Sequence, residues 1–317
     1  MFDFTHWRSH CPSFFWREAP TPVEEKTVYQ LGQLKVNVDL NPIGGYRGKV
    51  GTLTIGHVEH KVLTGWDAQD LQDLAQLMQT ILKIREIAHV DNTLIFARQN
   101  SDGQFKLSLV SYPKCNWIEK IQGFIHVIFG SPSLSEKKAA EIAEFYETQF
   151  SQEIEIFPTE VKQKEGKPDV FCRQNVIESQ RIVDLSFGDE CYHLLHDKNP
   201  KGATKEDPHF LIVPEGDSGH CDGSQVSLQK RLDMLKTAQK AMQFLQDEGF
   251  ATLLYLERNG PHLQGVKHKH AHVQGIKAFP EGFFAKLIVL MRQVYPATLS
   301  EKELDRRIQQ YQKYEWN

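Results

Sequence analysis

The sequence has little cysteine and none of the paired spacing on which cysteine-based structures depend. Its 317 residues include five cysteines, an odd number, and no CxxC motif occurs. This usage fits reduced thiols in a cytoplasmic protein better than a disulfide framework. A long hydrophobic run is missing too. No stretch of about 18 apolar residues occurs, and the start lacks the apolar core of a signal peptide, so we expect no membrane span.

An excess of charge of one sign is also missing. The 37 Lys and Arg residues nearly balance the 41 Asp and Glu residues, which gives a net charge of −4. This balance gives no support for a nucleic-acid partner or an acidic membrane surface. Hydrophobic residues make up 40% and charged residues 25%. These are ordinary values for a globular protein, and the length predicts about two domains.

What the sequence does contain is a repeat. The segment DLNP at 39–42 matches DKNP at 197–200, and the apolar segment 53–55 matches 211–213 in the same frame. Two short matches in one frame indicate a duplicated unit, and internal repeats determine the architecture that must be considered.

The order of expected elements repeats as well. After each match come an amphipathic helix, a strand, a second strand with alternating apolar residues, and a helix opened by a capping box. We expect these elements at 67–84, 92–100, 117–129 and from Ser133 in the first copy, and at 227–245, 251–260, 266–276 and from Ser300 in the second. The charged stretch 161–169 separates the copies. We therefore predict an α+β fold with units 1–160 and 161–317, each an antiparallel sheet with helices.

Three histidines alternate on the expected strand 266–276, namely His268, His270 and His272. Alternate residues of a strand project from one face, with neighbours roughly 6.5–7 Å apart. Three imidazoles on one surface are unusual as packing, because each buried ring needs hydrogen-bond partners. A nucleotide phosphate site, a metal site and a structural cluster remain open, and we favour the first.

The segment NGPHLQGVKHKHAHVQ at 259–274 resembles the signature of the histidine-triad (HIT) superfamily, in which a Gln, here Gln264, precedes the first His by four residues. Upstream, 191–202 and 209–214 resemble the family's ribose-binding strand and the strand after it. With the repeat, the chain is similar to the two-repeat branch, which holds hexose-1-phosphate uridylyltransferases and dinucleoside polyphosphate phosphorylases. This resemblance implies two tandem HIT-like units that form a pseudo-dimer within one chain.

The resemblance also implies a mechanism. A neutral imidazole can attack the α-phosphorus of a nucleotide and later leave, giving a covalent nucleotidyl-histidine, while flanking imidazoles stabilise phosphate charge. No cofactor or metal is expected at the triad, and any divalent metal would enter with the substrate. The implied roles are nucleophile for His270, orientation or phosphate contact for His268, phosphate contact for His272 and Gln264, ribose contact for Asp197, and ribose or phosphate contact for Asn259.

Two departures leave the reaction type open. Lys269 occupies a usually apolar position, and His272 stands where the phosphorylases commonly have Gln. The expected function is a nucleotidyl hydrolase or transferase acting on a small nucleotide. A dinucleoside polyphosphate phosphorylase or nucleotidylyltransferase is the alternative within the enzymes. A nucleotide-binding protein without turnover is the alternative outside them.

The first copy lacks the nucleophile. Aligning His126 with His272 puts Gln122 at the position of His268 and Phe124 at that of His270. A phenylalanine cannot attack phosphorus. We therefore expect one active site per chain, and a monomer in which the first unit completes the pseudo-dimer.

Two further motifs give weaker evidence about function. GGYRGKV at 44–50 is one residue short of a phosphate loop and is interpreted as a turn. GHCDG at 219–223, together with Cys191 and His193 or His196, contains metal-ligand residue types, but the spacing matches no zinc pattern. We therefore predict no resident metal site.

Overall fold

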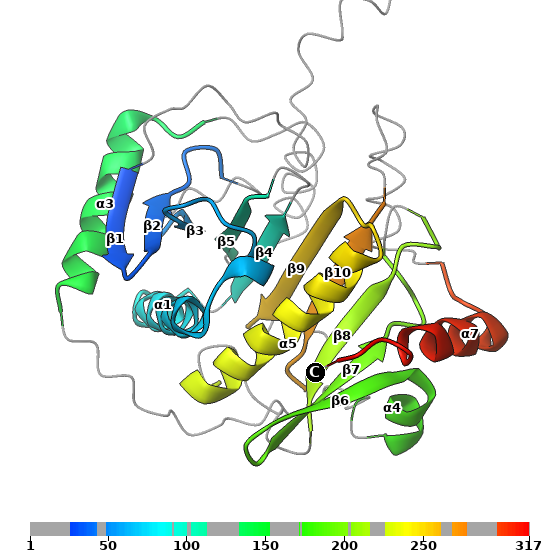
Figure 1. The fold of residues 1–317 in the computed structure, drawn as a ribbon. Coiled ribbons are helices and arrows are strands. Elements are labelled where there is room, and N and C mark those ends of the chain that lie inside the picture. Colours follow the sequence, from blue (N-terminus) through cyan, green and yellow to red (C-terminus); the bar gives the residue numbers. More distant parts are fainter. Residues whose placement is uncertain are drawn as a thin grey trace, which may run out of the picture.

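The computed structural model describes residues 26–42, 49–90, 92–99, 103–112, 133–152, 171, 173–201, 204–215, 226–260, 268–277 and 297–316. These residues form one antiparallel sheet of ten strands with helices packed on it (Figure 1), which confirms the predicted α+β class. None of the described helices is long and apolar enough to cross a membrane.

The elements follow the chain in two similar series. The first is β1 (Lys26–Leu31), β2 (Leu34–Val38), β3 (Thr52–His57), the 3-10 turn η3 (Leu63–Gly65), α1 (Ala68–Ile87), β4 (Asn92–Gln99), β5 (Phe105–Tyr112) and α3 (Glu136–Phe150). The second is α4 (Gln174–Gln180), β6 (Arg181–Phe187), β7 (Glu190–His196), β8 (His209–Pro214), α5 (Leu228–Asp247), β9 (Thr252–Asn259), β10 (Ala271–Ile276) and α7 (Glu301–Tyr311).

The strand order is the same when the sheet is read inward from either edge. From one edge it is β1-β2-β3-β5-β4, and from the other it is β6-β7-β8-β10-β9. The middle pair, β4 and β9, is antiparallel. Its register runs from Thr93 opposite Asn259 to Gln99 opposite Leu253, and Phe96 opposite Leu256 is its centre. Every strand of the first series therefore has a counterpart at the same distance from the centre of the sheet.

This order corrects the predicted counterpart of the histidine strand. We expected 117–129, which lies outside the described residues, but β5 occupies the place that mirrors β10. It pairs with β3 and β4 as β10 pairs with β8 and β9. The alignment relied on the two letters shared by 126–127 and 272–273, and two letters do not determine which strands pair.

The same ladders show which residues mirror the triad. His272 lies opposite Leu256, and Ser108 lies opposite Phe96. Because Phe96 and Leu256 form the central pair, Ser108 mirrors His272. The residues that mirror His270 and His268 are therefore Lys106 and Gln104, not Phe124 and Gln122.

The predicted match of 53–55 with 211–213 is wrong by one residue. Leu53 packs in the main core with Phe210, whereas Leu211 packs in a separate apolar cluster. Successive strand residues face opposite sides of a sheet, so a shift of one residue exchanges the faces.

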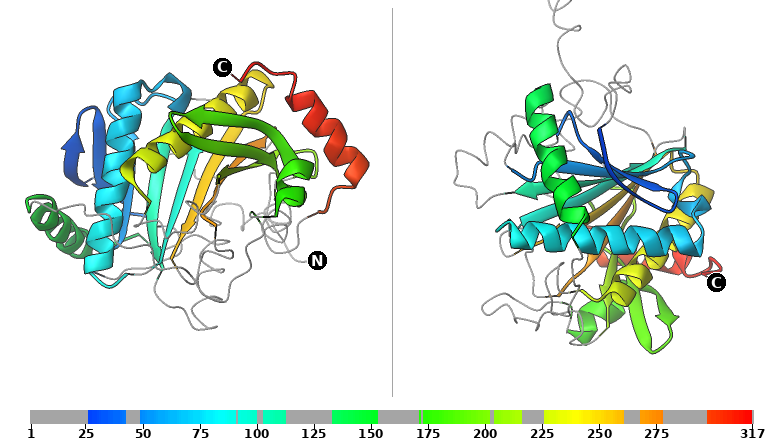
Figure 2. Two further views of the ribbon diagram at one scale, coloured as in Figure 1. Left: turned by 90° about the horizontal axis from the view of Figure 1, so that it is seen from below. Right: turned by 90° about the vertical axis from the view of Figure 1, so that its left-hand side faces the viewer.

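The two long helices, α1 and α5, lie side by side on one face of the sheet (Figures 1 and 2). Asp67 caps α1 through a capping box with Asp70, as its position before the apolar repeat predicts. Ser300 caps α7 through the backbone N–H of Glu303. The expected cap of α3 at Ser133 is wrong, because Ser135 supplies the cap.

Candidate active site

The histidines lie where the chain enters β10, near the middle of the sheet. The strand begins only at Ala271, so the predicted strand 266–276 is too long, and His268 and His270 precede the ladder. The rings remain clustered. The ring centroids of His270 and His272 are 4.8 Å apart, and those of Phe171 and His270 are 5.2 Å apart. Gly260, with a φ of 104° that favours glycine, follows the last residue of β9.

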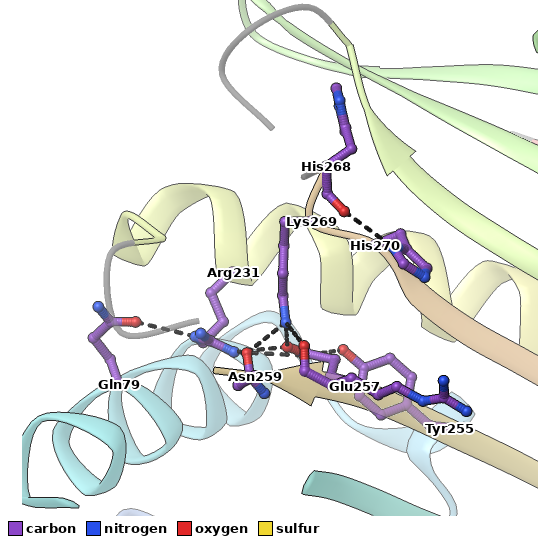
Figure 3. Close-up of polar contacts among 9 residues, drawn as sticks. Gln79, Arg231, Tyr255, Glu257, Asn259, His268, Lys269 and His270 are labelled. Atoms are coloured by element: carbon purple, nitrogen blue, oxygen red, sulfur yellow. Dashed lines mark hydrogen bonds and ion pairs between the residues drawn. The ribbon is translucent and has the colours of Figure 1, made fainter. Parts of the chain in front are cut away.

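Hydrogen bonds to backbone oxygens orient the first two rings. His268 Nε2 lies 2.6 Å from the carbonyl oxygen of Pro214, and His270 Nδ1 lies 3.0 Å from that of His268 (Figure 3). A carbonyl only accepts, so Nδ1 of His270 must carry the proton. In the neutral ring, Nε2 of His270 then keeps a free electron pair, which is the form that a nucleophile needs.

The pKa of His270 supports the neutral form. Burial lowers it to about 4, the positive charges of Lys269 and Arg258 act in the same direction, and the bond to the His268 carbonyl opposes them. Burial and the neighbouring His270 lower the pKa of His272 well below its usual value. Both rings are therefore neutral near pH 7.

A second hydrogen-bond chain reaches His272 from the loop after β7. His272 Nδ1 lies 2.9 Å from His209 Nε2, and His209 Nδ1 lies 2.9 Å from Asp197 Oδ2. The carboxylate only accepts, so His209 Nδ1 is protonated. His209 therefore links the ring of His272 to the Asp197 carboxylate and fixes the orientation of that ring. The sequence alone does not identify His209 as a site residue, although it opens the segment 209–214 that resembles a strand of the family.

Among the described residues, the Asp197 carboxylate has two contacts. Besides His209, its Oδ1 accepts a hydrogen bond from the backbone N–H of Asn199 at 2.9 Å. Burial opposes ionisation of Asp197, but the charge and hydrogen bond of His209 outweigh it, so the pKa lies below its usual value. A carboxylate has about four lone-pair positions, so these contacts leave room for the ribose hydroxyls it is predicted to bind.

Two cations lie near the rings. Arg258 follows Glu257 on β9 and therefore projects from the opposite face of the sheet, the face of His272. Burial and the charge of Arg258 lower the pKa of Lys201, and both cations lower that of His272. An anionic phosphate would be stabilised between these charges and the histidine rings.

Lys269 points away from this face into a buried ionic network (Figure 3). Its Nζ lies 2.8 Å from Glu257 Oε2 and also donates to the side-chain oxygen of Asn259. Arg231 of α5 lies 3.3 Å from the same carboxylate and donates to Gln79 of α1. The network therefore ties the residue between two triad histidines to both long helices.

The other predicted site residues are placed as follows. Asn259 lies in the Lys269 network and is buried. Gln264 lies outside the described residues, so its role stays a prediction. The described part of the chain thus brings together His268, His270, His272 and Asp197, with His209 as the link between the last two.

The depressed histidine pKa values predict an acid-sensitive fold. The pKa of His196 is lowered to about 4 by burial, as is that of His270, whereas an unfolded histidine titrates near 6.5. Between about pH 6.5 and 4 the unfolded chain binds more protons, so the free energy of unfolding is complete above that window and falls as the pH drops through it. Urea unfolding at about pH 7 and pH 5 measures the loss.

A matched variant separates this cause from general acid sensitivity. His196 stacks on Tyr311 with centroids 5.8 Å apart, and His196→Phe keeps an aromatic ring there but removes the titrating group. We expect a smaller loss of stability between the two pH values in this variant. An unchanged loss would contradict the assignment to His196.

The described residues thus form a ten-stranded antiparallel sheet with a histidine cluster beside its centre. No family model and no curated protein matches the chain. Solved structures do. A uridylyltransferase mutant aligns with a TM-score of 0.52 at 11% identity, over 96% of this chain and 94% of that chain. A second uridylyltransferase structure gives 0.51 at 11% identity, over 90% and 86%.

An ADP-glucose phosphorylase from Arabidopsis thaliana, with bound ADP-glucose, aligns with a TM-score of 0.45 at 13% identity, over 79% of this chain and 75% of that chain. The two uridylyltransferase structures, both with TM-scores above 0.5, confirm the fold that the resemblance predicted.

Proposed function

We propose that the chain is a nucleotidyl hydrolase or transferase that works through a covalent nucleotidyl-histidine. The observation that carries the proposal is the bond from His270 Nδ1 to the His268 carbonyl, because it leaves Nε2 as the basic atom. Nε2 attacks the α-phosphorus of a nucleoside phosphate, the N–P bond forms, and the P–O bond to the leaving group breaks. The acceptor then attacks phosphorus, and the N–P bond breaks to release the nucleotide and the free ring.

The supporting roles follow from the contacts. His268 orients the nucleophile through its carbonyl, and His272, whose ring is held by His209, contacts a non-bridging phosphate oxygen. Asp197 holds His209 and accepts from the ribose. Gln264 hydrogen-bonds the phosphate or leaving group, as the resemblance implies, and Asn259 contacts the ribose or phosphate at the end of β9.

The leaving group and acceptor are tested with a substrate panel. Dinucleoside polyphosphates, nucleotide sugars and phosphoramidate nucleotides are incubated with the protein, each with and without inorganic phosphate or hexose 1-phosphate. Release of a nucleoside monophosphate indicates hydrolysis, a nucleoside diphosphate formed only with phosphate indicates phosphorolysis, and a new nucleotide sugar indicates transfer. Tight nucleotide binding with no product in any arm would contradict an enzyme and support the binding-protein alternative.

We also propose that units 1–160 and 161–317 form a pseudo-dimer with a single active site, and that the chain works as a monomer. The strand order, which is the same inward from either edge, and the central Phe96–Leu256 pair support the pseudo-dimer. At the mirrored positions, Lys106 and Ser108 offer no imidazole. One bound non-hydrolysable nucleotide per chain is expected by calorimetric titration, and Lys106→Ala should leave turnover within about twofold of wild type. Two equivalent sites per chain would contradict the proposal.

A further inference from the structure

A second cluster of chemically active side chains lies at the β6–β7 edge of the sheet. Asp184 of β6 and Cys191 and His193 of β7 each place one ligand atom within 4.8 Å of the others. Asp184 and His193 are direct cross-strand partners, and their Oδ1 and Nδ1 atoms are 2.7 Å apart. Cys191 precedes His193 by two residues, so both side chains project from the same face of β7.

The groups around this cluster support a cation. The Cys191 thiol hydrogen-bonds to the Glu215 carboxylate, and the backbone N–H of Glu215 donates to the Cys191 carbonyl at 2.9 Å. The other oxygen of Asp184 lies 3.1 Å from Arg181, an arrangement that orients a carboxylate ligand. Two carboxylates beside a thiol and an imidazole are a donor set of oxygen, nitrogen and sulfur, which suits zinc.

The cluster is separate from the triad, although both lie on the same face of the sheet. Strand β8 lies between β7 and β10, which at the usual strand spacing separates His193 from the triad by roughly 10 Å. An apolar cluster fills that part of the face, and its members include Leu195, Leu211 and Val213. A metal here would therefore not touch the reacting atoms.

We propose that Asp184, Cys191 and His193 form a zinc-binding site, with Glu215 turning to complete the coordination. Binding requires the Cys191 proton to leave to solvent as the S–Zn bond forms. The His193 proton moves from Nδ1 to Nε2, so that the Nδ1 electron pair can bind the ion, and no oxidation or reduction is involved. The site would clamp β6, β7 and the residue after β8 at the open edge of the sheet. It differs from the sequence-based prediction of no resident metal, and it does not depend on the proposed nucleotide chemistry.

Metal analysis of the full-length protein tests the site. The protein is stripped with a chelator, reconstituted with ZnCl₂ and dialysed, and zinc is measured by mass spectrometry. CoCl₂ is used in parallel, because a thiolate bound to cobalt gives a charge-transfer band in the near ultraviolet. We expect one equivalent of zinc and this band in the wild type, and a melting temperature that falls when the metal is removed.

Variants decide which residues bind. Cys191→Ala should lose both the zinc and the cobalt band, and His193→Gln should lose the retained zinc. Ser186→Ala is the matched control, because Ser186 pairs with Cys191 across the hairpin and hydrogen-bonds its thiol without being a proposed ligand. Ser186→Ala and the triad variant His268→Ala should keep the metal.

Three results would overturn the proposal: no retained zinc in the reconstituted wild type, zinc retained in Cys191→Ala, or zinc lost in His268→Ala. If Cys191→Ala fails to fold, the cobalt spectrum of the wild type still decides, since a site without sulfur gives no charge-transfer band.

Discussion

Replacing His270 with asparagine is expected to lower kcat by about three orders of magnitude or more, because removing the covalent nucleophile of an enzyme has effects of that size. Asparagine keeps a side chain that can donate to the His268 carbonyl but has no basic nitrogen to attack phosphorus. Steady-state kinetics on the best substrate of the panel measure the change, and thermal unfolding shows whether the variant is folded.

His60→Asn is the matched control. His60 is exposed, lies in the first half, and has a φ of 54°, a conformation that asparagine tolerates better than most residues. Its kcat should stay near that of the wild type. A His270→Asn variant with a near-normal kcat would end the nucleophile assignment. His268→Asn and His272→Asn are expected to retain more activity, because those rings orient and stabilise but do not form the bond to phosphorus.

The second large effect concerns stability. Glu257→Ala should lower the free energy of unfolding by roughly 3–5 kcal/mol, because it removes the buried carboxylate that both Lys269 and Arg231 bind. Both partners reach this carboxylate with side chains that are about 1% exposed, and Tyr255 also donates to it. Burial would raise the pKa of Glu257, but Lys269 and Arg231 lower it to about 2, so it is charged near pH 7.

Urea unfolding measures this loss, and two further variants test its cause. Glu86 forms a partly exposed pair with Lys83 at 3.1 Å, so Glu86→Ala should change the free energy by no more than about 1 kcal/mol. The double variant Glu257→Leu with Lys269→Leu should be less destabilised than the sum of its two single variants, since it removes both members of the Glu257–Lys269 pair. A Glu257→Ala variant that loses less than about 1 kcal/mol would contradict the assigned role.

Local patterns predicted most of the fold. The period of apolar residues located α1 and α5, and Asp67 marked where α1 begins. Strand pairing was harder to predict, because it depends on contacts far apart in sequence. The alternating residues of β5 indicate a strand but not the strands with which it pairs, and the two-letter match at 126–127 does not supply that information.

For the site, too, local patterns were predictable and contacts between distant segments were not. The triad was visible because its histidines repeat at a fixed spacing, a local signal. Lys269 was recognised as unusual, but its partner Glu257 lies on the neighbouring strand, and no local pattern joins the two residues. Nothing in the segment 209–214 indicates a role for His209, because its link to Asp197 and His272 exists only once three segments meet.

The symmetric register of the middle strands has a consequence for chain architecture. If the chain were cut between 160 and 161, each fragment would expose the edge of β4 or β9, which now pair with each other. An unpaired strand edge can form a ladder with another chain. Two copies of β9 could pair with each other in antiparallel fashion, centred on Leu256, as β9 now pairs with β4. The second fragment expressed alone is thus a candidate homodimer with two complete histidine clusters, and mixing it with the first fragment would restore the single-site arrangement by strand exchange.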